Sequence, residues 1–257
     1  MEYIIISLAA IITSGLTLFS GFGLGTLLMP VFAIFFPVDI AIGLTAVVHL
    51  FNNLFKFVLL GKYVDKTVAL KFGLPAIIAA FFGARFLISL SDLKPLLSYY
   101  FFGHEFMVMP VKLVIAILMV LFSLFEIMPR LGKLTFENKY LPFGGILSGF
   151  FGGLSGHQGA LRSAFLIKCG LSKEGFIATG VVIACFVDIS RIFIYSTHLS
   201  LAEMSGNTYI LLTAIIAAFS GAFIGNRLIK KVTMRTVQLL VSIMIFGIAI
   251  GLGSGII

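Results

Sequence analysis

The sequence contains six apolar stretches that are each long enough to cross a lipid bilayer as an α-helix. They lie at residues 40–61, 69–90, 108–128, 174–197, 207–229 and 234–255. A helix rises about 1.5 Å per residue, so about 20 apolar residues span the hydrocarbon core. Composition agrees, because 60% of the 257 residues are hydrophobic and only 11% are charged. The sequence therefore predicts an all-α polytopic protein in a lipid bilayer, and it excludes a water-soluble enzyme or a nucleic-acid-binding domain.

Two further apolar stretches, at 2–36 and 139–168, are longer than one crossing needs and contain clusters of glycine. The first cluster is Gly21 to Gly25, and the second runs from Gly152 to Gly159. Glycine allows backbone conformations that end a helix. We expect each stretch to form a broken helical hairpin that returns to the side of the membrane it entered from. Shallow re-entrant loops and pairs of thin crossings both satisfy this pattern.

The positions of the basic residues predict the orientation of the chain. With the arrangement above, 12 of the 18 Lys and Arg residues fall in loops on one side, and only Lys94 and Lys112 fall on the other. Basic loops stay in the cytoplasm, so both termini should lie outside a cytoplasmic membrane. The net charge of +8 is then explained by basic loops that bind the anionic inner leaflet, so it does not indicate a nucleic-acid partner. All seven tyrosines lie near predicted span ends, as in an interfacial aromatic belt: Tyr3, Tyr63, Tyr99, Tyr100, Tyr140, Tyr195 and Tyr209.

The sequence also contains an internal repeat. Residues 76–84 (AIIAAFFGA) and 214–222 (AIIAAFSGA) agree at eight of nine positions. Residues 20–22 match 148–150, and residues 53–56 align with 188–191, so the offsets of 128, 135 and 138 increase along the chain. A hairpin that returns to the side it entered from adds no net crossing, so each half crosses the membrane three times. Because three is odd, the second half is inserted upside down relative to the first. We predict two inverted repeats, 1–128 and 139–257, joined by a cytoplasmic linker at 129–138, as in many secondary transporters.

The glycine breaks predict an anion site. A half-helix that starts after a break offers free N–H groups and the positive end of its dipole. We expect two such starts, near 24–26 and 157–160, to face each other and bind a small anion. The predicted substrate-binding residues are Gly21, Gly23, Gly25, His49, Asn52, Asn53, Lys56, Gly153, Ser155, Gly156, His157, Gln158, Gly159, Arg162, Asp188 and Arg191.

Helical spacing supports this grouping, but several members have a purely structural alternative. His49, Asn52, Asn53 and Lys56 share one helix face. His49 could instead make a core hydrogen bond, and Lys56 could extend to the interface. Asp188 and Arg191 are three residues apart and could simply neutralise each other. The glycines could serve only close helix packing.

Other classes of function lack the residues they need. Cys169 and Cys185 form no disulfide or metal-binding motif, and the four histidines lie on separate segments without an HxxxH pattern. We therefore expect no cofactor and no metal site, and an integral membrane enzyme is disfavoured. A cation or transition-metal permease remains the alternative, although Asp188 is the only clear carboxylate at membrane depth. His104 and Glu105 are expected to be solvated loop residues.

Three segments resemble the TauE/SafE family of sulfite and organosulfonate transporters. They are SGFGLGTLLMP at 20–30, LTAVVHLFNNLFKF at 44–57 and SGFFGGLSGHQGALRSAFLIKCGLSKEGFIATGVV at 148–182. The resemblance covers nearly the whole chain. It implies a transporter that exports a small sulfur-containing anion, sulfite or a sulfonate, across the cytoplasmic membrane. Leu24 and Thr26 interrupt the run of adjacent glycines that is usual in the family, and His157-Gln158 stands where many relatives have an apolar residue or glycine. These departures leave the identity of the substrate open. The sequence also leaves open whether the protein forms a homodimer.

Overall fold

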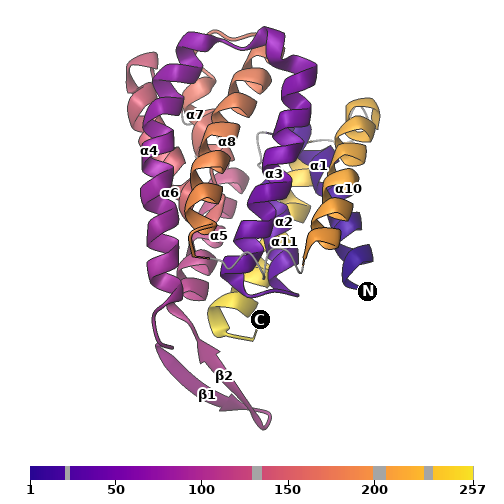
Figure 1. Cartoon of the computed structure of the whole chain (residues 1–257), viewed down its shortest axis with the longest axis vertical. Helices are drawn as coiled ribbons and strands as arrows, with labels where there is room; N and C mark the ends of the chain where they lie inside the picture. The colour runs from indigo at the N-terminus through magenta and orange to yellow at the C-terminus, as the bar shows by residue number, and fades with distance from the viewer. Residues whose placement is uncertain (21–23, 129–134, 199–206, 229–233, 257) are drawn as a thin grey trace.

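The computed structural model describes residues 1–20, 24–128, 135–198, 207–228 and 234–256, and it is built mainly of apolar helices (Figure 1). Within these residues, three segments are long and apolar enough to cross a membrane, namely Val38–Tyr63, Lys66–Ser91 and Lys173–Tyr195. Shorter apolar helical segments are Glu2–Gly15, Pro110–Leu124, Thr208–Ile224 and Ile245–Ser254. The fold is therefore that of a helical membrane protein.

The helices of the first half begin and end where the sequence supplies local signals. They are α1 (Glu2–Ser20), α2 (Leu24–Ala33), α3 (Val38–Leu60), the 3₁₀ turn η1 (Gly61–Tyr63), α4 (Lys66–Ser91) and α5 (Pro110–Ile127). Pro37 precedes α3, and Pro110 occupies the first position of α5, where a missing N–H costs no hydrogen bond. The Asp65 carboxylate caps α4 by accepting a bond from the Val68 N–H at 2.9 Å.

The second half contains a helical hairpin followed by longer helices. Its elements are η2 (Asn138–Tyr140), α6 (Leu141–Ser155), α7 (Gly159–Leu166), α8 (Lys173–Tyr195), α10 (Thr208–Leu228) and α11 (Met234–Ser254). The Phe136 N–H donates to the Ala164 carbonyl at 3.2 Å. This bond joins the segment that precedes η2 and α6 to the last turn of α7, so the hairpin returns to the end of the molecule where it started.

A β-hairpin departs from the expected all-α structure. Strand β1 (Leu97–Phe101) pairs antiparallel with β2 (His104–Val108), and Leu97 lies opposite Val108. Phe102 and Gly103 have φ angles of 48° and 78°, which form the two-residue turn that suits a twisted hairpin. The helix expected at 108–128 therefore begins at Pro110. His104 and Glu105 are exposed, as expected, but they lie in a strand.

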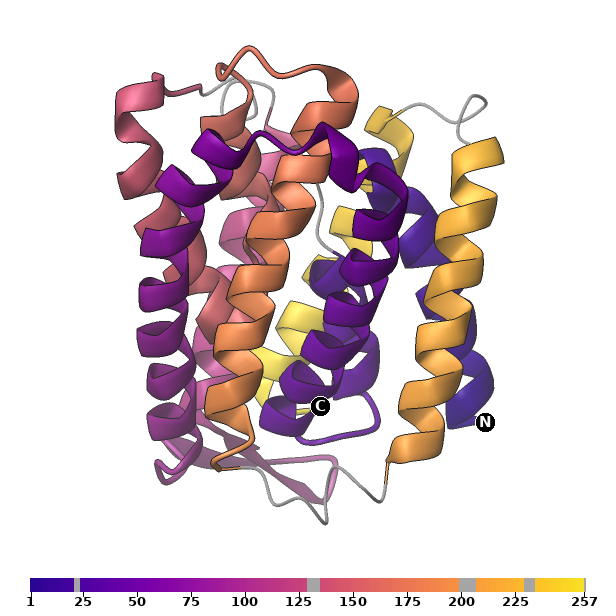
Figure 2. The same cartoon turned by 45° about the horizontal axis from the view of Figure 1, so that its top comes forward.

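Helices of the first half pack against helices of the second half. α4 packs against α6 and α8, while α10 packs against α1 and α3; α5 contacts α11, and α3 contacts α8 (Figure 2). Both termini and the β-hairpin lie at one end of the molecule, and the α3–α4 and α7–α8 connections lie at the other (Figure 1). The described helices thus form one bundle in which α3 and α8 are central.

Glycines let α6 and α4 approach until their backbones touch. A Cβ atom on Gly145, Gly149 or Gly153 would lie 2.2 Å from the carbonyl oxygen of Phe72, Ala76 or Ala80, respectively. The three glycines are spaced four residues apart on one face of α6, so no side chain fits anywhere along this contact. Small residues create such contacts in membranes, where no hydrophobic effect drives helices together. We call this contact the α4–α6 seam.

Two sequence expectations need correction. Tyr195 was placed in the interfacial belt, but its side chain is buried and its hydroxyl donates to the Gly153 carbonyl. The match of 20–22 with 148–150 is also out of register, because Ser148 lies in the middle of α6 whereas Ser20 ends α1. The starts of α2 and α7, and of α3 and α8, are both 135 residues apart. A glycine- and phenylalanine-rich sequence yields such short matches by chance.

Candidate functional site

The second glycine break is a single tight turn at Gly156, His157 and Gln158. Gly156 ends α6 with a φ of 80°, a left-handed conformation that favours glycine, and its N–H donates to the Gly152 carbonyl at 3.0 Å. Gly159 begins α7. The break is narrower than the predicted range of Gly152 to Gly159, because Gly152 and Gly153 remain helical.

The first break lies next to the second. The predicted site residues Gly21 and Gly23 are outside the described residues. Gly25 is the second residue of α2, and a Cβ atom there would lie 3.7 Å from the Gly156 carbonyl oxygen and 3.7 Å from Thr45 Cγ2. The start of α2 therefore meets the Gly156 turn of the other half, with the middle of α3 beside them.

A buried hydrogen-bond network joins α3 to α8. Asp188 is fully buried, and its Oδ2 lies 2.7 Å from His49 Nδ1 and 3.4 Å from Asn53 Nδ2. A carboxylate only accepts, so His49 carries a proton on Nδ1. Asn53 Nδ2 also lies 3.3 Å from both ring nitrogens of His49. This network brings together three of the predicted site residues from two central helices.

Arg191 completes the network and contacts the Gly156 turn. Its Nε and Nη2 donate to Asp188 Oδ1 at 3.0 and 2.8 Å, and its Nη1 donates to the Gly152 carbonyl at 3.4 Å. A Cβ atom on Gly156 would lie 2.9 Å from Arg191 Nη1. The side chain is fully buried, and all three of its nitrogens are engaged. The pairing proposed as a structural alternative for Asp188 and Arg191 is therefore present.

Two further basic residues lie near this network without an acidic partner of their own. Arg162, half-buried on α7, donates from Nη1 to Gln158 Oε1 at 3.2 Å, and its Nε faces Gly180 of α8. Lys56, on α3, is 6% exposed. Within the part of the chain that the structure describes, Lys56 makes no hydrogen bond or ion pair.

Three buried polar nitrogens near the breaks have no hydrogen-bond partner among the described residues: Asn52 Nδ2, His157 Nε2 and Gln158 Nε2. Asn52 accepts a bond from Ser14 of α1 at 3.1 Å through Oδ1. His157 Nδ1 lies 3.0 Å from Ser155 Oγ, and its ring stacks on Phe122 at 5.6 Å between centroids. Buried donors normally find partners, so these nitrogens mark where a ligand or water is expected.

Sequence reasoning missed three polar residues of this region. Ser14 bonds to Asn52, Ser148 donates to the Gln158 carbonyl at 3.0 Å, and Tyr195 bonds to the Gly153 carbonyl. Helical spacing could have found Tyr195, because it lies one turn beyond Arg191 on α8. Ser148 carried no such signal, since its partner is a backbone carbonyl across the turn.

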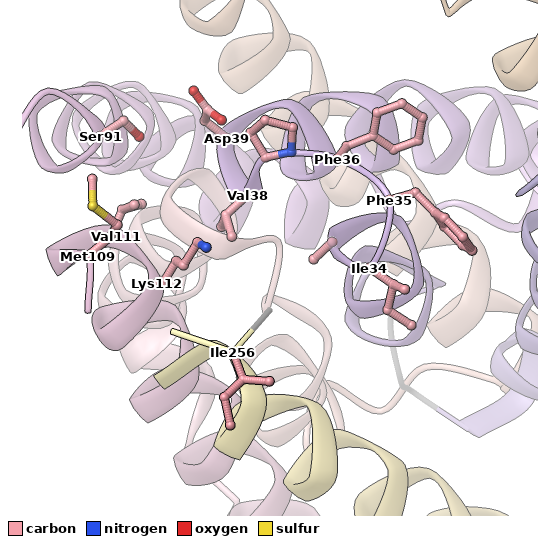
Figure 3. A pocket seen from close by; sticks show the side chains of 12 residues that line it. Ile34, Phe35, Phe36, Val38, Asp39, Ser91, Met109, Val111, Lys112 and Ile256 are labelled. Atoms are coloured by element: carbon pink, nitrogen blue, oxygen red, sulfur yellow. The ribbon is translucent and has the colours of Figure 1, made fainter. Parts of the chain in front are cut away.

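A pocket of about 520 Å³ (Figure 3) is lined by residues other than those of this network, at the end of the molecule that carries the β-hairpin (Figure 1). Its charged lining residues are Asp39 and Lys112. The remaining lining comes from the α2–α3 connection, the end of α4, the start of α5 and Ile256. None of the predicted site residues lines it.

The charges of the central network suit an anion better than a metal cation. Asp188 is the only buried carboxylate among the described side chains, whereas Lys56, Arg162 and Arg191 contribute three positive charges. The described residues contain no group of three His, Cys, Asp or Glu side chains that could hold a metal ion. Lys, Arg and amide donors are the groups that bind oxyanions.

The family model described as "Sulfite exporter TauE/SafE" matches residues 4–252. No curated protein and no solved structure matches the chain.

Proposed function

The chain belongs to the TauE/SafE family of sulfite exporters, and from this premise we propose that it exports a small sulfur-containing anion, sulfite or a sulfonate. Members of the family are membrane transporters, not enzymes. The proposed route crosses the cytoplasmic membrane, with both termini outside.

The observation that carries the proposal is the excess of positive charge at the centre of the bundle. Ionised groups are expensive to bury unless they are paired. One carboxylate faces three cationic side chains here, so an anion would balance the remaining charge. A permease for metal cations would need the opposite balance, with several carboxylates at membrane depth.

Two half-helix starts supply the second part of the proposed site. α2 begins beside the Gly156 turn, and α7 begins directly after it. Free N–H groups at such starts bind anions without a charged side chain. We place the substrate between these starts, within reach of the polar face of α3 and of Arg162 and Arg191.

The proposed mechanism is alternating access between two inverted repeats. It is supported by the packing pairs, because α4 on α6 corresponds to α10 on α1, and α4 on α8 corresponds to α10 on α3. It is also supported by the offset of 135 residues that the starts of α2 and α7 share with the starts of α3 and α8. Rocking of one repeat against the other around a central site is the usual motion of such folds.

The membrane potential favours export. An interior-negative potential of 100 mV contributes about 2.3 kcal/mol for each negative charge that leaves the cell. Uncoupled efflux of a monoanion would therefore proceed against about a 50-fold concentration gradient, so the proposed export needs no coupling ion.

Uptake into inverted membrane vesicles tests the proposal. We expect vesicles that contain the protein to accumulate labelled sulfite faster than vesicles without it, and unlabelled sulfonate, but not nickel, to compete. Arg162→Ala and Arg191→Ala should each lose most of the uptake while the protein stays in the membrane. Arg85→Ala is the matched control, since the Arg85 side chain is exposed on α4. No uptake above empty vesicles would overturn the proposed function.

A further inference from the structure

We infer that His157 presents a hydrogen-bond acceptor to the proposed anion site, and that the site therefore selects a monoanion that carries a hydrogen-bond donor, such as hydrogen sulfite. The inference rests on the proposed function and narrows its substrate class. It makes His157 a residue that determines specificity, because oxyanions without a donor should bind less tightly.

His157 lies in the turn where the two half-helix starts meet. It directly follows Gly156, whose carbonyl oxygen lies 3.7 Å from the Cβ position of Gly25 in the first turn of α2. It directly precedes Gln158, the N-cap residue of α7. The His157 side chain therefore leaves the backbone at the place where we position the substrate. It is 3% exposed, so any partner of its ring lies inside the bundle.

The hydrogen bonds of His157 determine which ring nitrogen carries the hydrogen. Nδ1 lies 3.1 Å from the Ser155 carbonyl oxygen and 3.0 Å from Ser155 Oγ. The carbonyl can only accept, and the Ser155 hydroxyl donates its own hydrogen to the Phe151 carbonyl at 3.1 Å. Both partners of Nδ1 are thus acceptors, so Nδ1 is the nitrogen that donates.

The opposite ring nitrogen, Nε2, is an acceptor. The ring is neutral, because a charged ring would be buried without an acidic partner. The only buried carboxylate among the described side chains, Asp188, bonds to α3 and to Arg191 instead. In a neutral imidazole with its hydrogen on Nδ1, Nε2 can only accept. Nε2 is buried and has no hydrogen-bond partner among the described residues, while the ring is held by its stacking on Phe122 of α5.

The groups that follow His157 in the chain are donors. Gln158 Oε1 accepts from Arg162 Nη1 at 3.2 Å, which leaves the amide nitrogen buried and without a partner among the described residues. α7 begins at Gly159 without a side-chain cap, so its first N–H groups can donate to a ligand. Sulfate or methanesulfonate, which only accept, could satisfy these donors but not His157 Nε2. Hydrogen sulfite offers charged oxygens and one donor, so it suits both kinds of group.

Sulfamate and methanesulfonate are the probes that test this inference. Both are singly charged and similar in size, but sulfamate has an –NH₂ group where methanesulfonate has a methyl group. Calorimetric titration of the purified protein in detergent should show sulfamate binding about fivefold or more tightly, since an unpaired buried acceptor weakens binding. His157→Phe keeps a ring that can stack on Phe122 but lacks the acceptor, so the preference should disappear. His104→Phe, on the exposed strand β2, should keep it.

The wild-type comparison decides the matter even if a variant fails to fold, which gel filtration and a melting curve would show. Equal wild-type affinities, a preference for methanesulfonate or no binding of either anion would overturn the inference. A folded His157→Phe protein that still prefers sulfamate would also overturn it. None of these results would touch the proposed function. Absence of sulfite uptake into vesicles would overturn the proposed function even if sulfamate were the preferred ligand.

Discussion

At the scale of single residues, Asp188 holds the centre of the molecule together. Its two oxygens accept from His49, Asn53 and Arg191, which connects α3 to α8. Through Arg191 the connection extends to the Gly152 carbonyl of α6. The carboxylate thus positions three helices around the breaks. Removing it should therefore lower the stability of the protein more than it changes the substrate selectivity.

We predict that Asp188→Asn destabilises the protein strongly, because it leaves the buried Arg191 guanidinium without a counter-ion. Removing one member of a buried pair typically costs about 3–5 kcal/mol, whereas replacing both members is often nearly neutral. The double variant Asp188→Asn/Arg191→Gln should therefore melt at a higher temperature than Asp188→Asn alone. Melting curves of the detergent-solubilised proteins measure this.

The matched control is Glu137→Gln, which removes an ion pair of similar length from the surface. Glu137 Oε2 lies 2.8 Å from Lys139 Nζ, but both side chains are mostly exposed. Exposed pairs contribute about 0–1 kcal/mol, so the melting temperature should barely change. Equal effects of Glu137→Gln and Asp188→Asn would contradict the structural role of the buried network.

At the scale of helices, the α4–α6 seam sets how closely the second hairpin can sit against the bundle. Gly149→Ala would place a Cβ atom 2.2 Å from the Ala76 carbonyl oxygen, where neither backbone can yield without moving a helix. Overpacking of this kind costs about 1–3 kcal/mol. We expect a clearly lower melting temperature and, because the Gly156 turn follows in the same helix, slower sulfite uptake.

Gly247→Ala provides the comparison for this substitution. Gly247 also lies inside a helix, α11, but a Cβ atom there meets no described atom within 4 Å. Alanine favours a helix over glycine by about 1 kcal/mol, so this variant should be as stable as the wild type or slightly more stable. If both alanine variants behaved alike, close backbone contact would not explain the glycines of α6.

The sequence predicted helices more reliably than it predicted the use of each glycine. The lengths of the apolar stretches placed α3, α4 and α8 within a few residues of their observed ends. A glycine can break a helix or let another backbone approach, and local sequence does not distinguish these uses. Gly156 ends the helix α6, whereas Gly153 remains helical and lies in the α4–α6 seam. Lys56 and Arg162 were predicted as site residues, but their contrast with Arg191 depends on tertiary hydrogen bonds that no spacing reveals.

At the scale of the whole molecule, the charge bias and the fold suggest one arrangement in the membrane. The β-hairpin and both termini share one end, and the connection through η1 lies at the other (Figure 1). From the positions of the basic residues, we propose that the η1 end faces the cytoplasm. Export would then carry the anion from the η1 end toward the end with the pocket lined by Asp39 and Lys112.

Cysteine labelling tests this orientation. Both native cysteines are first replaced by serine; Cys185 is buried in α8, and burial together with the negative charge of Asp65 raises the pKa of the Cys169 thiol. Phe102→Cys places a thiol at the tip of the hairpin, and Lys62→Cys places one in η1. Both native side chains are exposed, so both new thiols should be accessible.

We predict that a membrane-impermeant maleimide labels the Phe102→Cys variant in intact cells and the Lys62→Cys variant only in inverted vesicles. The reason is that the two positions lie at opposite ends of a bundle about as long as a membrane is thick, since α4 alone has 26 residues. The reverse pattern would mean that the basic loops face outward and that the proposed direction of transport is wrong. Labelling of both variants from one side would mean that α4, the helix between the two positions, does not cross the membrane and that the proposed topology is wrong.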